Sequence, residues 1–132
     1  MAKSLYWADN YLENRQSADQ AIQRIHSGQR VFIGSACGEP QALVRALADQ
    51  AHTFTGLEIV RMMSNESAPL TEIATKSYET SFSIRQIYLG AARSEYFARN
   101  LRFVTPMNIS DVPLLFRSRK LPIDVALIQV SP

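Results

Sequence analysis

Residues 30–63 hold, in order, an apolar run, a glycine-bearing turn, an amphipathic stretch and a second apolar run. The first run, RVFIG (30–34), is β-branched and aromatic, which is typical of a strand covered on both faces, and we predict that it is central. The second run, LEIVRMM (57–63), predicts another strand. Between them one apolar stripe recurs at helical spacing, made by Leu43, Val44, Leu47 and Ala51. A strand, a helix and a strand form a βαβ unit, whose right-handed crossover makes the two strands parallel.

The rest of the chain continues the alternation of strands and helices. Before the first strand, the later part of residues 9–27 predicts an amphipathic helix that ends at Gly28. Further elements are predicted as strands over 84–90, 102–107 and 122–130, a helix over 91–100, and a short helix capped by Ser110 and Asp111 that runs through Arg117. This order predicts an α/β fold with an open, mostly parallel sheet and helices on both faces.

Residues 64–83 are polar and rich in turn-forming residues, with at most one helical turn at 71–74. So long a loop in a compact domain is usually functional or disordered, and the sequence leaves both possibilities open.

The last predicted strand, PIDVALIQV (122–130), is almost continuously apolar and is therefore predicted to lie in the middle of the sheet. It is followed by only two residues. We therefore expect the 132-residue chain to be one domain that is a fragment of a longer protein.

The composition excludes several classes of function. Fourteen basic and twelve acidic residues leave a formal charge of +2, so no strong field favours nucleic acid or an anionic membrane surface. No apolar stretch approaches the roughly 20 residues of a membrane span. Cys37 is the only cysteine, and the two histidines lack zinc-ligand spacing, so we expect no disulfide, no bound metal and a cytoplasmic location.

The turn after the first strand is the candidate site. Ligands of open parallel sheets bind beyond the carboxyl ends of the strands, where this turn lies. Its glycines either let the strand reverse into a helix or bring bare backbone to a ligand, and the following helix end favours an anion or a developing oxyanion. The spacing matches neither a Walker loop nor a dinucleotide fingerprint. The candidate binding residues are Gly34, Ser35, Gly38, Glu39, Pro40 and Gln41.

Two side chains of this turn could carry chemistry. Glu39 could be a covalent nucleophile. However, it precedes Pro40 and should sit just outside the helix, where the helix dipole stabilises its charge, so a structural or substrate-orienting role is favoured. Cys37 could be an activated thiolate, but no histidine is near it in sequence, and a small buried residue is the favoured interpretation. No residue of the chain is therefore assigned as catalytic.

The stretches SGQRVFIGSACGEPQALVRAL and LPIDVALIQVSP resemble the amino-terminal half of the acetyl-CoA hydrolase/transferase family, which includes 4-hydroxybutyrate and acetate CoA-transferases. The resemblance spans about residues 18–132 and is most specific at 34–41 and 124–132; SDVPLLFRSRKLP (110–122) resembles the segment that leads into the last strand. The turn is also similar to the amino-terminal signature of family I CoA-transferases. It departs from that signature in being shorter and in having Ser35-Ala36 where a Gly-Phe pair is expected.

The resemblance implies a CoA-transferase/ribose-phosphate-isomerase-like fold in a two-domain enzyme, with the active site between similar halves. It implies that the substrates are an acyl-CoA, which is a CoA thioester, and a carboxylate, and that no cofactor is permanently bound. A glutamate of the carboxyl-terminal half would attack the thioester. No stretch of this chain resembles the surroundings of that glutamate, so we expect the chain alone to be inactive and to need the missing carboxyl-terminal half. Self-association into a homo-oligomer is also expected to be possible.

Three functional hypotheses remain from the sequence. The first is the amino-terminal domain of a CoA-transferase or acetyl-CoA hydrolase. The second is a non-catalytic CoA-binding or protein-interaction module with the same fold, because the chain shows no complete set of acid, base and nucleophile. The third is a relative of sugar-phosphate isomerases, which rests on fold analogy alone.

Overall fold

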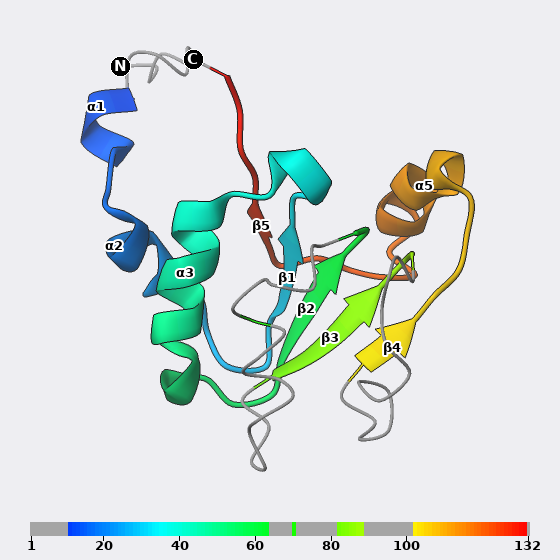
Figure 1. Cartoon of the computed structure of the whole chain (residues 1–132), viewed down its shortest axis with the longest axis horizontal. Coiled ribbons are helices and arrows are strands. Elements are labelled where there is room, and N and C mark those ends of the chain that lie inside the picture. Colours follow the sequence, from blue (N-terminus) through cyan, green and yellow to red (C-terminus); the bar gives the residue numbers. More distant parts are fainter. Residues whose placement is uncertain (1–10, 64–69, 71–81, 89–101, 132) are drawn as a thin grey trace, which may run out of the picture.

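The computed structural model describes residues 11–63, 70, 82–88 and 102–131. Five strands form one sheet in the order β4-β3-β2-β1-β5, and every neighbouring pair is parallel. The strands are β1 (Arg30–Ile33), β2 (Leu57–Arg61), β3 (Phe82–Gln86), β4 (Arg102–Val104) and β5 (Val125–Leu127). Figure 1 shows the strands fanning across the molecule. The predicted open parallel sheet is confirmed, as is the central place of β1, which lies between β2 and β5.

One face of the sheet is covered by two helices, α2 (Ala18–Ile22) and α3 (Gln41–Asp49), which contact each other. Alternate residues of each strand point to this face because the side-chain period of a strand is two. The resulting core is made by residues that are almost fully buried, among them Ile22, Val31, Ile33, Val44, Leu47, Leu57, Ile59, Ile84 and Leu127.

The opposite face is covered by α5 (Val112–Arg117). Phe32 alternates with the core residues of β1, and its ring meets the ring of Phe116 edge-on, with centroids 5.5 Å apart. Val60 of β2 is also fully buried outside the α2/α3 core. Helices therefore cover both faces, as predicted.

The segment before β1 differs from the single helix predicted there. It forms α1 (Tyr11–Asn14) and then α2, which begins with a capping box. The Ser17 side chain accepts a hydrogen bond from the Gln20 backbone, and the Gln20 side chain accepts one from the Ser17 backbone. The helix ends at Ile22, several residues before Gly28, which occupies a left-handed turn at φ +82°.

The elements after β2 agree in part with the prediction. β3 begins two residues earlier than expected and β4 is shorter. The short 3-10 helix η5 (Ile109–Asp111) leads into α5, and Asp111 precedes that helix without a side-chain capping bond. The predicted helix over 91–100 lies outside the described residues, as does most of the 64–83 loop.

The last strand is shorter than predicted and lies elsewhere in the sheet. Only Val125–Leu127 pair, and their partner is β1, so β5 is an edge of the described sheet and not a middle strand. The apolar residues that follow it, Ile128 and Val130, are exposed. The apolar pattern therefore predicted a strand here but not its register or its neighbours.

Candidate functional site: the glycine loop after β1

The stretch of residues 34–40, called here the glycine loop, joins β1 to α3 at the carboxyl end of the sheet (Figure 1). It contains the short 3-10 helix η2 (Ala36–Gly38). Pro40 occupies the N-cap of α3, one position before the first helical turn. The structure thus confirms the predicted strand-to-helix turn and places it where open parallel sheets bind ligands.

The glycine loop is tied to the strands on both sides of β1. The Gly34 N–H donates to the Leu127 carbonyl of β5 over 2.9 Å. On the other side, the Ser35 hydroxyl accepts a hydrogen bond of 3.0 Å from the Met62 N–H, and the Ala36 N–H donates to the Met63 carbonyl over 3.2 Å. The loop is therefore fixed in place before any ligand arrives.

The two glycines of the loop have different roles. A Cβ built on Gly34 would lie 2.8 Å from the Gly38 carbonyl oxygen, so the loop closes on itself only because Gly34 has no side chain. A Cβ on Gly38 would meet nothing within 4 Å. The left-handed position of the loop is Ala36, at φ +52°. Gly38 is thus the glycine whose bare surface faces open space.

Several backbone donors of the loop are already used within the chain. Besides the N–H groups of Gly34 and Ala36, that of Gly38 donates to the Ser35 carbonyl and that of Glu39 to the Ala36 carbonyl. These four groups hold the turn together. A contact between the loop and a ligand would rely on the exposed surface at Gly38 and on the start of α3.

Glu39 is buried, with 5% of its surface exposed. Its extended backbone, with φ −69° and ψ 122°, places it just outside α3, as predicted for a residue before proline. Its Oε1 accepts a hydrogen bond from Gln41 Nε2 over 3.3 Å. Glu39 is thus a buried residue whose carboxyl group is bonded by the side chain of the exposed Gln41.

Cys37 is exposed, which contradicts its interpretation as a buried residue. The sequence could not reveal this, because the direction of a loop side chain depends on how the loop is held. Here the backbone bonds on both sides of Cys37 turn η2 towards solvent.

Two buried polar residues near the glycine loop were missed by the sequence analysis. Arg61 ends β2 and Gln86 ends β3, and they are paired neighbours in the sheet. Arg61 also pairs with Ile33, the residue before the glycine loop. Among the described residues, the buried polar or charged side chains are thus Arg61 and Gln86, at the carboxyl ends of adjacent strands, and Glu39, in the loop that follows the neighbouring strand β1. The sequence signal that could have identified these two residues is a polar residue at the end of an apolar strand.

A charge network lies on the opposite face of the sheet, across three strands. Glu58 accepts hydrogen bonds from Arg30 Nε over 2.5 Å and from Arg85 Nε over 2.6 Å. Arg30 also donates to the Pro122 carbonyl and Arg85 to the Thr105 hydroxyl. Burial raises the pKa of Glu58, but the hydrogen bonds and charges of the two arginines outweigh it and lower that pKa below its ordinary value of 4.5. The network joins the strands and the segments that enter and leave α5.

Within the part of the chain that the structure describes, no group of three or more His, Cys, Asp or Glu side chains is placed to hold a metal ion. In the same residues, no helix has the length and apolar character to cross a bilayer.

Comparison with known proteins agrees with this architecture. A curated relative, the 4-hydroxybutyrate coenzyme A transferase of Clostridium kluyveri, is 33% identical over 125 residues, which cover 95% of this chain and 28% of the relative. The crystal structure of RipA from Yersinia pestis superposes with a TM-score of 0.80 at 22% identity, covering 95% of this chain and 31% of that one. A 4-hydroxybutyrate CoA-transferase from Porphyromonas gingivalis has a TM-score of 0.65 at 22% identity, covering 96% and 27%. These two structures support the fold.

The chain spans less than a third of the length of these relatives. The family described as acetyl-CoA hydrolase/transferase N-terminal domain matches residues 2–132, which is nearly the whole chain. The chain therefore belongs to the acetyl-CoA hydrolase/transferase family, within its N-terminal domain.

Proposed function

We propose that this chain forms one wall of the active-site cleft of an enzyme that moves CoA between an acyl-CoA and a carboxylic acid, or water. The observation that carries the proposal is the glycine loop. It is fixed to β5 and to Met62 and Met63, the residues that follow β2, and its outer surface at Cys37 and Gly38 is exposed. A rigid surface without a Cβ lets a thioester approach the main chain closely.

The proposal assigns binding roles to the residues after Gly38. Gln41, which is exposed, is the first residue of α3 and is oriented by the buried Glu39. Its amide can contact the polarised acyl oxygen or the carboxylate of the acceptor. The first-turn N–H groups of α3, before the bond that Val44 donates to Pro40, add a positive field at the same place. Neither Glu39 nor Gln41 forms a covalent bond in this scheme.

The nucleophile is assigned to the remainder of the enzyme, as the family resemblance implies. A glutamate carboxylate attacks the thioester carbonyl, the CoA thiolate leaves, and an acyl-glutamyl anhydride forms. The thiolate then attacks the glutamyl carbonyl, which releases the carboxylic acid and leaves a glutamyl-CoA thioester. The acceptor carboxylate then attacks the glutamyl carbonyl and the CoA thiolate leaves; the thiolate attacks the acceptor's acyl carbon in the resulting anhydride, which forms the new acyl-CoA and frees the glutamate. With water as the acceptor, hydrolysis of the glutamyl thioester releases CoA and the glutamate. The contribution of the present chain is to position the thioester.

A chimera provides the experiment. In it, this chain replaces the matching segment of the Clostridium kluyveri transferase, and CoA transfer is measured with several acyl-CoA donors and acceptors. We expect Gln41→Ala to lower kcat/KM at least about tenfold, the equivalent of losing one good hydrogen bond in the transition state. Arg45→Ala, at another exposed position of α3, is the matched control and should leave turnover unchanged.

Titration calorimetry of the 132-residue chain with CoA and acyl-CoA separates the rival classes. If the chimera is active and Gln41→Ala has the same kcat/KM as the Arg45→Ala control, the glycine loop does not line the cleft. A chain that binds CoA in calorimetry but supports no transfer in the chimera would be a non-catalytic ligand-binding module. A phosphosugar that raises the melting temperature, where CoA does not, would favour the isomerase relationship.

A further inference from the structure

The short helix α5 exposes an apolar side chain beside a hollow. Leu114, in the middle of the helix, is 60% exposed. It lines a hollow of about 480 Å³ together with the partly buried Met107 and Leu115. Sites for small ligands have volumes in this range and combine apolar walls with a few polar groups. The hollow therefore has the size and the apolar wall of a ligand site.

The charged residues that line this hollow lie at the two ends of α5. Asp111 precedes the first residue of the helix, and its Oδ2 accepts a hydrogen bond of 3.4 Å from Asn108 Nδ2. Arg117 is the last residue of the helix, and Lys120 follows three residues later. A rise of 1.5 Å per residue puts about 9 Å of helix between the two ends. The hollow thus has a carboxylate at one end and two cations at the other.

The turn after α5 brings Lys120 back towards the helix. Arg119 has φ +55°, a left-handed conformation that residues other than glycine adopt infrequently. The Leu121 N–H then donates to the Leu115 carbonyl over 3.4 Å, so the chain folds back onto the helix. Arg117 and Lys120 consequently line the same hollow, whereas Arg119 is not one of the described residues that line it.

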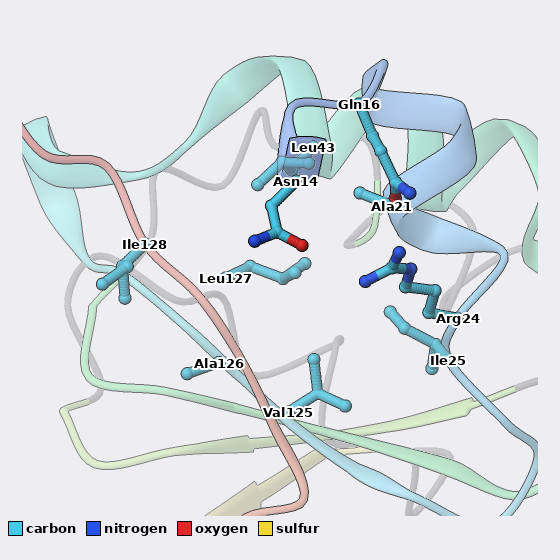
Figure 2. Close-up of a pocket in the computed structure, with 10 residues that line it drawn as sticks. All are labelled: Asn14, Gln16, Ala21, Arg24, Ile25, Leu43, Val125, Ala126, Leu127 and Ile128. Atoms are coloured by element: carbon cyan, nitrogen blue, oxygen red, sulfur yellow. The ribbon is translucent and has the colours of Figure 1, made fainter. Parts of the chain in front are cut away.

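A second hollow, of about 410 Å³, has a different set of polar groups. It is lined by residues of α1 to α3 and of β5, and Figure 2 shows the Arg24 guanidinium with the amides of Asn14 and Gln16. Among the described residues that line it there is no carboxylate. The hollow beside α5 specifies its ligand more narrowly, because it carries charges of both signs at separate ends.

We propose that the hollow beside α5 binds a nucleoside diphosphate. The diphosphate lies against Arg117 and Lys120, whose side chains donate charge-assisted hydrogen bonds to its oxygens. The base packs against Leu114 and against Met107, whose thioether makes favourable contacts with aromatic rings. An amine of the base or a ribose hydroxyl donates to the Asp111 carboxylate, which accepts hydrogen bonds and donates none when ionised.

The lining favours this class of ligand over other anions. Inorganic diphosphate would be attracted by the two cations, but it would be repelled by Asp111 and would make no use of the apolar wall. The carboxylates of an acidic peptide would meet the same repulsion. A nucleoside without phosphates would leave Arg117 and Lys120 without an anion. A nucleoside diphosphate matches the cations, the apolar wall and the carboxylate together.

A free nucleoside diphosphate and the 3′-phospho-ADP end of CoA share this chemistry. For a free nucleotide the inference depends on the hollow alone, and for CoA it rests on the proposed function. Calorimetric titration of the 132-residue chain with ADP, GDP, 3′-phospho-ADP and CoA separates the two sources. Affinities for ADP or GDP at least equal to that for CoA indicate a free nucleotide. Tighter binding of both CoA and 3′-phospho-ADP than of ADP and GDP indicates CoA.

Three substitutions of basic residues test where the diphosphate binds. Arg117→Ala and Lys120→Ala should each raise the Kd of ADP at least about fivefold, because each removes a charge-assisted hydrogen bond. Arg119→Gly is the matched control, since it removes a charge from the same turn and glycine adopts φ +55° readily. It should change the Kd of ADP less than about twofold. Equal weakening by all three would mean a general attraction to the basic turn and would overturn the inference.

Asp111 provides a test in which two ligands respond with opposite signs. Asp111→Ala should raise the Kd of ADP at least about threefold, because an acceptor is lost, and should lower the Kd of inorganic diphosphate, because a repelling charge is lost. Asp111 makes no side-chain capping bond to α5, so the variant should fold, and melting temperatures check this for every variant. If Asp111→Ala tightens the binding of both ligands, the hollow binds any anion and the inference is wrong.

The outcomes separate this inference from the proposed function. If none of the nucleotides binds at millimolar concentration, or if inorganic diphosphate binds the unsubstituted chain as tightly as ADP, the inference is overturned even where the chimera transfers CoA. Nucleotide binding that weakens with Arg117→Ala and Lys120→Ala supports the inference even where the chimera transfers no CoA, and that second result counts against the proposed function alone.

Discussion

Gln41 Nε2 donates a hydrogen bond of 3.3 Å to Oε1 of the buried residue Glu39, so the side chain of the first residue of α3 is held by the last residue before Pro40. The two residues flank Pro40, the N-cap of the helix. An exposed amide is thus oriented by a group that solvent and substrate do not reach easily.

Substitutions of Glu39 test whether its carboxylate only orients Gln41 or takes part in the reaction. In the chimera, Glu39→Gln keeps an oxygen that can accept the bond from Gln41 and should retain kcat within about threefold, whereas Glu39→Ala should lose at least about tenfold. Steady-state kinetics with one acyl-CoA donor measures both. Equal inactivation by the two substitutions would mean that the charge of Glu39 takes part in the chemistry.

The glycines of the loop should respond differently to alanine. Gly34→Ala places a Cβ 2.8 Å from the Gly38 carbonyl oxygen and should lower the free energy of unfolding by about 1–3 kcal/mol. Gly38→Ala meets no atom within 4 Å and should leave stability unchanged or raise it by up to about 1 kcal/mol. Urea unfolding of the 132-residue variants measures both. Similar stability of the two variants would refute the close approach at Gly34.

The Ser35 hydroxyl links the loop to β2 and should contribute measurably to stability. Ser35→Ala leaves the part-buried Met62 N–H without this acceptor and should cost about 1–2 kcal/mol. Ser27 makes a comparable bond to the Thr55 N–H at an exposed position, so Ser27→Ala should cost less than about 0.5 kcal/mol. Thermal unfolding compares the two variants, and a larger loss from Ser27→Ala would contradict the assignment.

The network around Glu58 predicts a specific pH dependence. Because the folded-state pKa of Glu58 lies below its ordinary value of 4.5, its stabilising contribution is complete above that pH and is lost as the pH falls through the lower folded-state pKa. Glu58→Gln should lower stability at pH 7 by no more than about 1 kcal/mol, because solvent screens the partly exposed network, and should flatten the decline of stability below pH 4.5.

Urea unfolding between pH 3 and pH 7 tests this, with Glu13→Gln, an exposed glutamate in α1, as the control. If the free energy of unfolding of Glu58→Gln declined at acid pH as steeply as that of the unsubstituted chain, Arg30 and Arg85 would not be stabilising the ionised carboxylate of Glu58.

The sequence predicted those parts of the fold that depend on local pattern. The strand at 30–33, the helix from 41 and the strand at 57–61 follow from apolar periodicity and from the glycines between them. The extended backbone of Glu39 follows from the proline after it. The α/β class and the parallel pairing follow from the order of these elements.

The sequence-based predictions were wrong or incomplete where tertiary packing, and not local pattern, determines the structure. Residues 9–27 have a helical pattern, but the capping box at Ser17 starts a new helix there; S-x-x-Q was a visible signal that periodicity alone overlooked. The exposure of Cys37 depends on bonds between the loop and β2. The contact of Glu58 with Arg30 and Arg85 requires the strand register, which a single sequence does not provide.

The central claim is that the open surface at Gly38 lines the cleft where the thioester binds. Gly38→Trp places a large side chain on this surface, and because a Cβ at this position meets no atom within 4 Å, we expect the protein still to fold. The direct measurement is kcat/KM for CoA transfer by the chimera, with its melting temperature as the folding control. We expect kcat/KM to fall at least about a hundredfold at an unchanged melting temperature. Full activity with Trp at this position would contradict it.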